Sequence, residues 1–139
     1  MREYVAESKA APDRLWAEVS AVQAWPDVLP TFDAVRHIAG PHPPQVGTRF
    51  AVRQPGLVAL TYEVTDWDPP RSFTWVGRTL GVTTTARHTV EPAPAGSRVT
   101  LGLDWSGPFA WLVRILFSAK ASQMIASEGD TLARLAEQG

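Results

Sequence analysis

The 139-residue chain is 45% hydrophobic and 19% charged with a formal net charge of −1, a composition typical of one globular domain and not of a disordered chain. Basic and acidic residues are scattered along the sequence, which argues against a nucleic-acid surface because phosphate binding needs a concentrated basic face. The absence of cysteine excludes disulfides, thiol catalysis and thiolate metal sites.

The N-terminal part of the chain predicts one strand followed by helices. Arg2–Ser8 alternates as a short strand does. Lys9–Ser20 has apolar residues at helical spacing, and Pro12 suits the first turn of a helix, where its missing N–H costs nothing. A second helical piece is expected over Val22–Trp25. It should end there, because a residue that precedes a proline is disfavoured in the helical region.

From Thr31 onward the hydrophobic period changes to two, which is typical of strands. Glycine and proline separate these segments, as they do in turns. The predicted strands are Phe32–Ile38, Thr48–Gln54, Leu57–Asp66, Arg71–Arg78, Val82–Glu91 and Arg98–Trp105. With the first strand this makes about seven, joined by short connections, and predicts an antiparallel meander.

After Ser106-Gly107-Pro108 the pattern becomes helical to the end of the chain. Mostly apolar residues recur at threes and fours at Leu112, Ile115, Ala119, Ser122, Ala126, Gly129 and Leu132. A sheet with one apolar face needs a cover, and this helix is the longest element available. The chain is therefore expected to have an α+β fold. A twisted sheet that curls around one helix cannot contact it everywhere, so a cavity is expected between them.

Several stretches resemble the START-like (SRPBCC) superfamily, in particular its polyketide cyclase/dehydrase-like bacterial branch. They are AAPDRLWAEVSAVQAWPDVLP, the strand opening at Gly47, EVTDWDPPRSFTW, HTVEP…GSRVTL, and the terminal helix with Glu128 and Leu132. The resemblance covers essentially the whole chain. It implies the helix-grip fold: a curved antiparallel sheet of about seven strands around a long C-terminal helix, with two short helices after the first strand. It also implies a deep, mostly apolar cavity.

Alternation along the strands predicts which side chains face that cavity, because successive residues point to opposite faces. The more apolar face of each strand should point inward, together with the stripe of the C-terminal helix. The predicted ligand-binding residues are Phe50, Val52, Tyr62, Phe73, Trp75, Thr84, Ala86, His88, Leu101, Leu103, Trp105, Ile115, Ala119 and Ser122. The large aromatic side chains in this set suit core packing as well as ligand stacking.

His88 and Tyr62 are the best candidates for catalysis, since imidazole and phenol groups can move protons. Each also has a structural alternative as a hydrogen-bonded interior side chain. No complete acid/base pair is recognisable, because Asp104 falls on the outer face of its strand. No nucleophile elbow, phosphate-binding loop or dinucleotide fingerprint is present. His37 and His42 lack a carboxylate at ligand spacing. Neither a metal nor a cofactor is therefore expected.

The stretch Phe109–Phe117 is apolar almost all round but is too short to span a bilayer and contains Arg114. Three roles are open for this stretch: it could be buried in the core, form a gate at the cavity mouth together with Pro55-Gly56-Leu57, or form an interface. The N-terminus lacks the apolar core of a signal peptide. The sequence therefore predicts a cytoplasmic protein without stable membrane insertion, either a monomer or a homodimer.

Three functions are compatible with these patterns. The first is binding of a small hydrophobic or aromatic molecule, such as a polyketide, an isoprenoid or a lipid. The second is catalysis of aldol cyclisation and dehydration in the same cavity, as the resemblance to aromatase/cyclases implies. The third is an interaction module whose interior is packed solid and holds no ligand.

Overall fold

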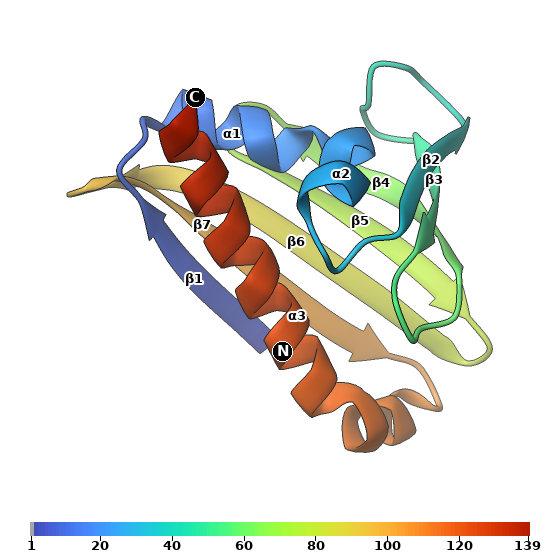
Figure 1. The fold of residues 1–139 in the computed structure, drawn as a ribbon. Helices are drawn as coiled ribbons and strands as arrows, with labels where there is room; N and C mark the ends of the chain where they lie inside the picture. Colours follow the sequence, from blue (N-terminus) through green and yellow to red (C-terminus); the bar gives the residue numbers. More distant parts are fainter. Residues whose placement is uncertain (1) are drawn as a thin grey trace.

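The computed structural model describes residues 2–139 and consists of a seven-stranded antiparallel sheet with one long helix across its concave face (Figure 1). The strands are β1 (Arg2–Ser8), β2 (Ala34–Ala39), β3 (Arg49–Arg53), β4 (Leu60–Asp68), β5 (Ser72–Thr79), β6 (Val82–Ala93) and β7 (Gly96–Ser106). The helices are α1 (Pro12–Ser20), the 3-10 turn η1 (Val22–Ala24), α2 (Trp25–Val28) and α3 (Ala110–Gln138). The predicted helix-grip architecture is confirmed.

The strand order is β1-β7-β6-β5-β4-β3-β2, so β2 to β7 form the predicted meander. The first strand pairs with the last, in register from Arg2 opposite Leu103 to Ser8 opposite Ser97. The segment α1–η1–α2 then carries the chain to the other edge of the sheet, where β2 begins (Figure 1). These helices cover one end of the concave face, and α3 runs diagonally across the rest.

The expectation that a helix ends before Pro26 is wrong. Trp25 has helical dihedral angles and begins α2, with Pro26 in the first turn. A proline is tolerated at that position because the first N–H groups of a helix have no partner within it. Trp25 is also held by its surroundings, since its side chain is buried and its indole N–H donates to the Glu18 carbonyl oxygen at 3.3 Å.

The strand boundaries differ from the predicted ones at both sides of the Pro55-Gly56 turn. Residues Leu57, Val58 and Ala59 remain in the loop, and β4 begins only at Leu60. The β6–β7 hairpin is longer than predicted and extends to Ala93 and Gly96. Gly96 has a φ of +151°, and a Cβ atom there would lie 2.6 Å from carbonyl oxygens of the segment before α1. The hairpin tip therefore requires glycine.

The main core lies beneath α1 and α2 and is rich in aromatic side chains. Trp25, Phe50, Phe73 and Trp75 are almost completely buried there. A second, smaller cluster, which includes Val82 and Trp105, packs against the first half of α3. The sheet and the helix diverge between the two clusters, and this geometry positions the site.

Candidate functional site

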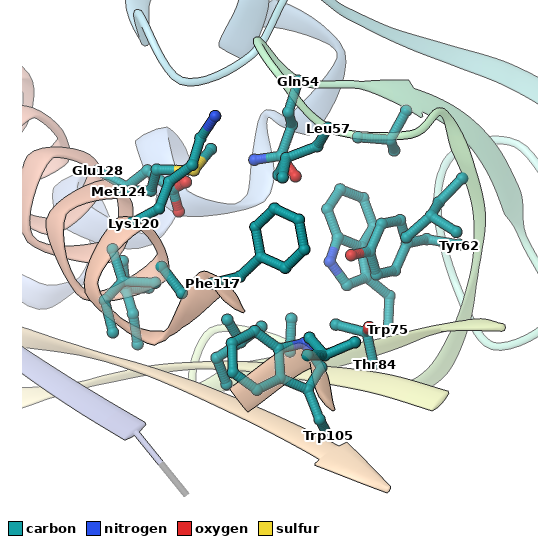
Figure 2. Close-up of a pocket in the computed structure, with 18 of the residues that line it drawn as sticks. Gln54, Leu57, Tyr62, Trp75, Thr84, Trp105, Phe117, Lys120, Met124 and Glu128 are labelled. Carbon is teal, nitrogen blue, oxygen red and sulfur yellow. The ribbon is translucent and has the colours of Figure 1, made fainter. Parts of the chain in front are cut away.

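A cavity of about 250 Å³ lies between the curved sheet and α3 (Figure 2). Its wall comes from β3 to β7, the loop before β4, and α3, and most of it is aliphatic or aromatic. Nine of the predicted ligand-binding residues line it: Val52, Tyr62, Trp75, Thr84, Ala86, His88, Leu101, Leu103 and Trp105. The strand-face assignments thus place these side chains where the alternation predicted them.

Two predicted residues lie behind the cavity wall. Phe50 and Phe73 are 0% exposed and pack within the aromatic core. Phe73 stacks on His88 and contacts Trp75, so these two side chains stand between it and the cavity. Both phenylalanines therefore support the wall without forming its surface.

The predicted stripe of α3 is rotated relative to the observed one. Ile115 is 71% exposed and Ala119 is also exposed, and Ser122 accepts a hydrogen bond from Arg2 at 2.8 Å near β1. None of the three lines the cavity. The residues of α3 that do are Val113, Phe117, Lys120, Ala121, Met124, Ile125 and Glu128. The expectation failed because the start of α3 is apolar on almost every side, so its pattern does not select one face.

Glu128 is the functional candidate that sequence reasoning missed. Its side chain lines the cavity and is only 8% exposed. Burial raises its pKa to about 8, because a carboxylate loses solvation in an apolar site. The buried Thr31 hydroxyl opposes this rise, although its geometry falls short of a full hydrogen bond. Near neutral pH the carboxyl is therefore mostly protonated, but its ionised form is accessible.

Tyr62 faces Glu128 across the cavity, with its hydroxyl directed inward (Figure 2). Its ring stacks on Trp75 with centroids 5.0 Å apart. Gly77 on β5 leaves room for the ring, since a Cβ atom there would lie 3.0 Å from it. Burial, followed by the negative charge of ionised Glu128, raises the Tyr62 pKa above its usual value. The phenol therefore stays protonated and can donate a hydrogen bond.

His88 is held as a neutral imidazole in the wall. Its ring stacks on Phe73 with centroids 4.0 Å apart, and Nδ1 lies 3.2 Å from the Phe73 carbonyl oxygen. A carbonyl oxygen can only accept, so Nδ1 carries the proton and Nε2 is left as an acceptor. Burial lowers the His88 pKa to about 4. His88 thus suits ligand contact or structural support better than proton donation at neutral pH.

The mouth of the cavity lies between the loop before β4 and the first half of α3. The residues that line the cavity there are Leu57, Val58, Val113 and Phe117. The side chain of Lys120 crosses toward Gly56, where an added Cβ atom would contact its Nζ atom. Of the open alternatives for Phe109–Phe117, plain burial is excluded, because most of its large side chains are exposed.

Within residues 2–139, no group of three or more histidine, aspartate or glutamate side chains has an arrangement that could hold a metal ion. The same part of the chain contains no helix long and apolar enough to cross a membrane.

Residues 3–137 match the family described as polyketide cyclase/dehydrase and lipid transport. The match spans nearly the whole chain, and the protein belongs to this family. Comparison with curated proteins finds no significant sequence match.

Several solved structures have the same fold at low sequence identity. The Zhui aromatase/cyclase from a Streptomyces species superposes with a TM-score of 0.79 at 16% identity, over 99% of this chain and 93% of that one. A protein from Thermus thermophilus gives 0.70 at 16% identity, over 98% and 93%. The di-domain aromatase/cyclase StfQ of the steffimycin pathway gives 0.73 at 12% identity, over 99% and 45%. These likenesses establish the fold.

Proposed function

We propose that this protein binds a compact, mainly apolar ligand, aromatic or polyketide-like, in the cavity between the sheet and α3. The proposal is carried by one observation: a cavity with an aromatic and aliphatic wall into which a few polar groups converge. Ligand sites of proteins have this composition. The volume of about 250 Å³ is just below the range for small-molecule sites, roughly 300–1,000 Å³. It favours a ligand of a few rings over a lipid with two long acyl chains.

The expected contacts follow from the wall. Trp75 and Trp105 offer aromatic surface, and apolar burial contributes about 25 cal/mol per Å² before the entropic cost of binding. The Tyr62 hydroxyl and the Glu128 carboxyl can each hydrogen-bond a ketone or hydroxyl group of the ligand. Because these two groups come from opposite walls, they would fix the orientation of a flat molecule between them.

Replacement of Ala86 by leucine is expected to weaken binding of an uncharged aromatic probe, N-phenyl-1-naphthylamine, by about tenfold or more. Ala86 lies in the wall between Trp75 and Leu103 on the neighbouring strands. The added carbons would therefore occupy space that the probe needs. Binding is measured by titration of the probe emission, with quenching of the protein's tryptophan fluorescence as a second signal.

The matched control is Thr85→Leu, which adds a leucine to the same strand on the opposite face. This variant should bind the probe as the unmodified protein does. Equal affinity of the Ala86→Leu and Thr85→Leu variants would contradict binding in the cavity. Absence of saturable binding to the unmodified protein, for this probe and for a panel of polyphenols and isoprenoids, would favour the interaction module.

A second function, aldol cyclisation and dehydration of a poly-β-ketone, is favoured by the buried Glu128 carboxyl. A group with a pKa of about 8 exists in both protonation states near neutral pH, as a general acid/base must. Ionised Glu128 would take a proton from a carbon between two ketones. That carbon would then form a bond to a distant carbonyl carbon, which closes the ring, and the protonated Glu128 carboxyl would return its proton to the carbonyl oxygen. Loss of one water molecule and enolisation of the remaining ring ketones would make the ring aromatic, with the Tyr62 hydroxyl holding a ketone oxygen in place.

The two functions are distinguished by Glu128→Gln in the presence of a synthetic linear poly-β-ketone thioester. If the protein is a cyclase, the appearance of aromatic absorbance should slow by about 100-fold or more, while affinity for the naphthylamine probe stays unchanged. Glu137→Gln, at an exposed carboxylate near the end of the same helix, is the control and should keep full turnover. Probe binding without any turnover by the unmodified protein would leave ligand binding as the function.

A further inference from the structure

Large apolar side chains are exposed at the end of the molecule where the loop before β4 and the start of α3 approach the cavity. They come from the loop before β4, the β5–β6 turn and the start of α3, which lie at the same end of the molecule (Figure 1). Phe109 joins two of these segments, because its N–H donates to the Gly81 carbonyl oxygen at 3.1 Å and its ring lies against Gly81. We call this surface the mouth patch; it consists of Val58, Leu80, Phe109, Trp111, Ile115 and Leu116.

The exposure of the mouth patch is high for a protein surface. Leu80 is 92% exposed, Val58 76% and Ile115 71%. Exposed apolar side chains gathered at one end of a molecule mark an interaction site, because a monomer in water gains nothing from them. Val58 also lines the cavity, so the patch is continuous with the opening through which a ligand would enter.

The segments that form the mouth patch carry basic residues and no acidic ones. The segments 54–60, 79–82 and 106–124 contain Arg114 and Lys120 and no aspartate or glutamate, and Arg53 and Arg78 flank them. The nearest carboxylate in sequence, Asp104, shares a small surface hollow with Arg2 and Arg114, so two cations face one anion there. A surface that complements this patch would have an apolar interior for the exposed side chains and negative charges at its boundary for the basic ones.

A second copy of the chain does not offer that surface. A two-fold contact would place the patch against itself, with Arg78, Arg114 and Lys120 opposed by their own copies and no carboxylate from the same segments between them. An anionic bilayer fits both features. Aromatic and aliphatic side chains enter the boundary between headgroups and acyl chains, and arginine and lysine contact lipid phosphates.

We propose that the mouth patch docks the protein reversibly on anionic membrane surfaces, with the cavity opening toward the lipid. The apolar start of α3 would lie in the plane of the interface, and an apolar ligand would pass between the bilayer and the cavity without crossing water. This property goes beyond ligand binding itself, which needs no membrane.

The test is flotation of the 139-residue protein with vesicles made of equal parts phosphatidylcholine and phosphatidylserine, compared with vesicles of phosphatidylcholine alone. The protein should float with the anionic vesicles and bind the neutral ones much more weakly. High salt should release it, because headgroup charge is screened. A blue shift of tryptophan emission, absent in Trp111→Phe, would report entry of that side chain into the interface.

Ile115→Asp should weaken binding to the anionic vesicles by about tenfold or more, since it replaces an inserting side chain with a charged one. Val46→Asp is the matched control. Val46 is 57% exposed in the loop between β2 and β3, outside the patch, and its variant should bind as before. Arg78→Gln should weaken binding by about fivefold, the effect of one cation near an anionic surface.

Failure of the unmodified protein to float with anionic vesicles would overturn the proposal. Equal flotation of the Ile115→Asp and Val46→Asp variants would do the same. A dimer in solution that Ile115→Asp dissociates would assign the patch to a second copy, against our inference. Ile115 does not line the cavity, so the Ile115→Asp variant should still bind N-phenyl-1-naphthylamine in solution. Its probe binding therefore separates failure of docking from failure of the proposed ligand site.

Discussion

Truncation of Trp75 to alanine is expected to lower the free energy of unfolding by about 3–5 kcal/mol. The indole is 2% exposed and lies at the centre of the aromatic core. It stacks on Tyr62 at 5.0 Å between centroids and has edge contacts with Trp25 at 5.5 Å and Phe73 at 5.7 Å. Its removal would leave a large void next to the existing cavity, and rigid neighbouring rings cannot collapse to fill it.

The measurement is equilibrium unfolding in urea, with Trp111→Ala as the matched control. Trp111 is 56% exposed on α3, and its truncation should change stability by less than about 0.5 kcal/mol. Domains are stable by only about 5–15 kcal/mol, so Trp75→Phe provides a milder variant that retains one ring. Equal stability of the Trp75→Ala and Trp111→Ala variants would show that the aromatic cluster is not the core of the fold.

The Trp75→Ala replacement should also reduce ligand affinity, because Trp75 lines the cavity. Its two roles can be separated with Phe50→Leu, which alters the cluster behind the wall and leaves the cavity surface intact. That variant should lose stability and keep probe binding. The core and the site are thus built on the same sheet face, with the site forming where helix packing stops.

The sheet was predictable because its strands carry clear local signals. In β6, Thr84, Ala86 and His88 alternate with Thr83, Thr85 and Arg87. The more apolar set does line the cavity, together with Arg87 from the other set. Pro69-Pro70 lies between β4 and β5, as expected of the prolines that separate the predicted strands. Such signals are local, since the period of two fixes which side chains share a face.

The rotation of α3 could not be predicted in this way. Its start is apolar almost all round apart from Arg114, and two charged residues further along α3, Lys120 and Glu128, line the cavity. One close approach accounts for the observed rotation: a Cβ atom on Gly129 would lie 2.9 Å from the Tyr4 ring of β1. Because Gly129 faces β1, the preceding residue turns toward the cavity. This contact joins the two ends of the chain, and no local pattern contains it.

Glu128→Gln is expected to make the protein more stable at alkaline pH, by about 5 kcal/mol at pH 8.5. The folded-state pKa of Glu128, about 8, lies above its usual value of 4.5. The unfolded chain therefore releases this proton first as the pH rises. The contribution of Glu128 to the free energy of unfolding is therefore complete below pH 4.5 and is lost as the pH rises toward 8. Glutamine has the same shape and no ionised form, so the variant should not show this decline.

His88 acts in the opposite direction, because burial lowers its pKa from 6.5 to about 4. Its contribution to stability is present above pH 6.5 and is lost as the pH falls toward 4. In the unmodified protein the two effects should nearly cancel between pH 4.5 and 6.5, with a net decline from pH 6.5 to 8. In Glu128→Gln only the histidine effect remains, so stability should rise to pH 6.5 and then stay level.

Urea unfolding across pH 4 to 8.5, with Glu137→Gln as the control, measures both curves. A constant difference between the Glu128→Gln variant and the unmodified protein at every pH would mean that Glu128 is already ionised in the folded state, and the cavity would then contain a buried anion in place of a neutral acid.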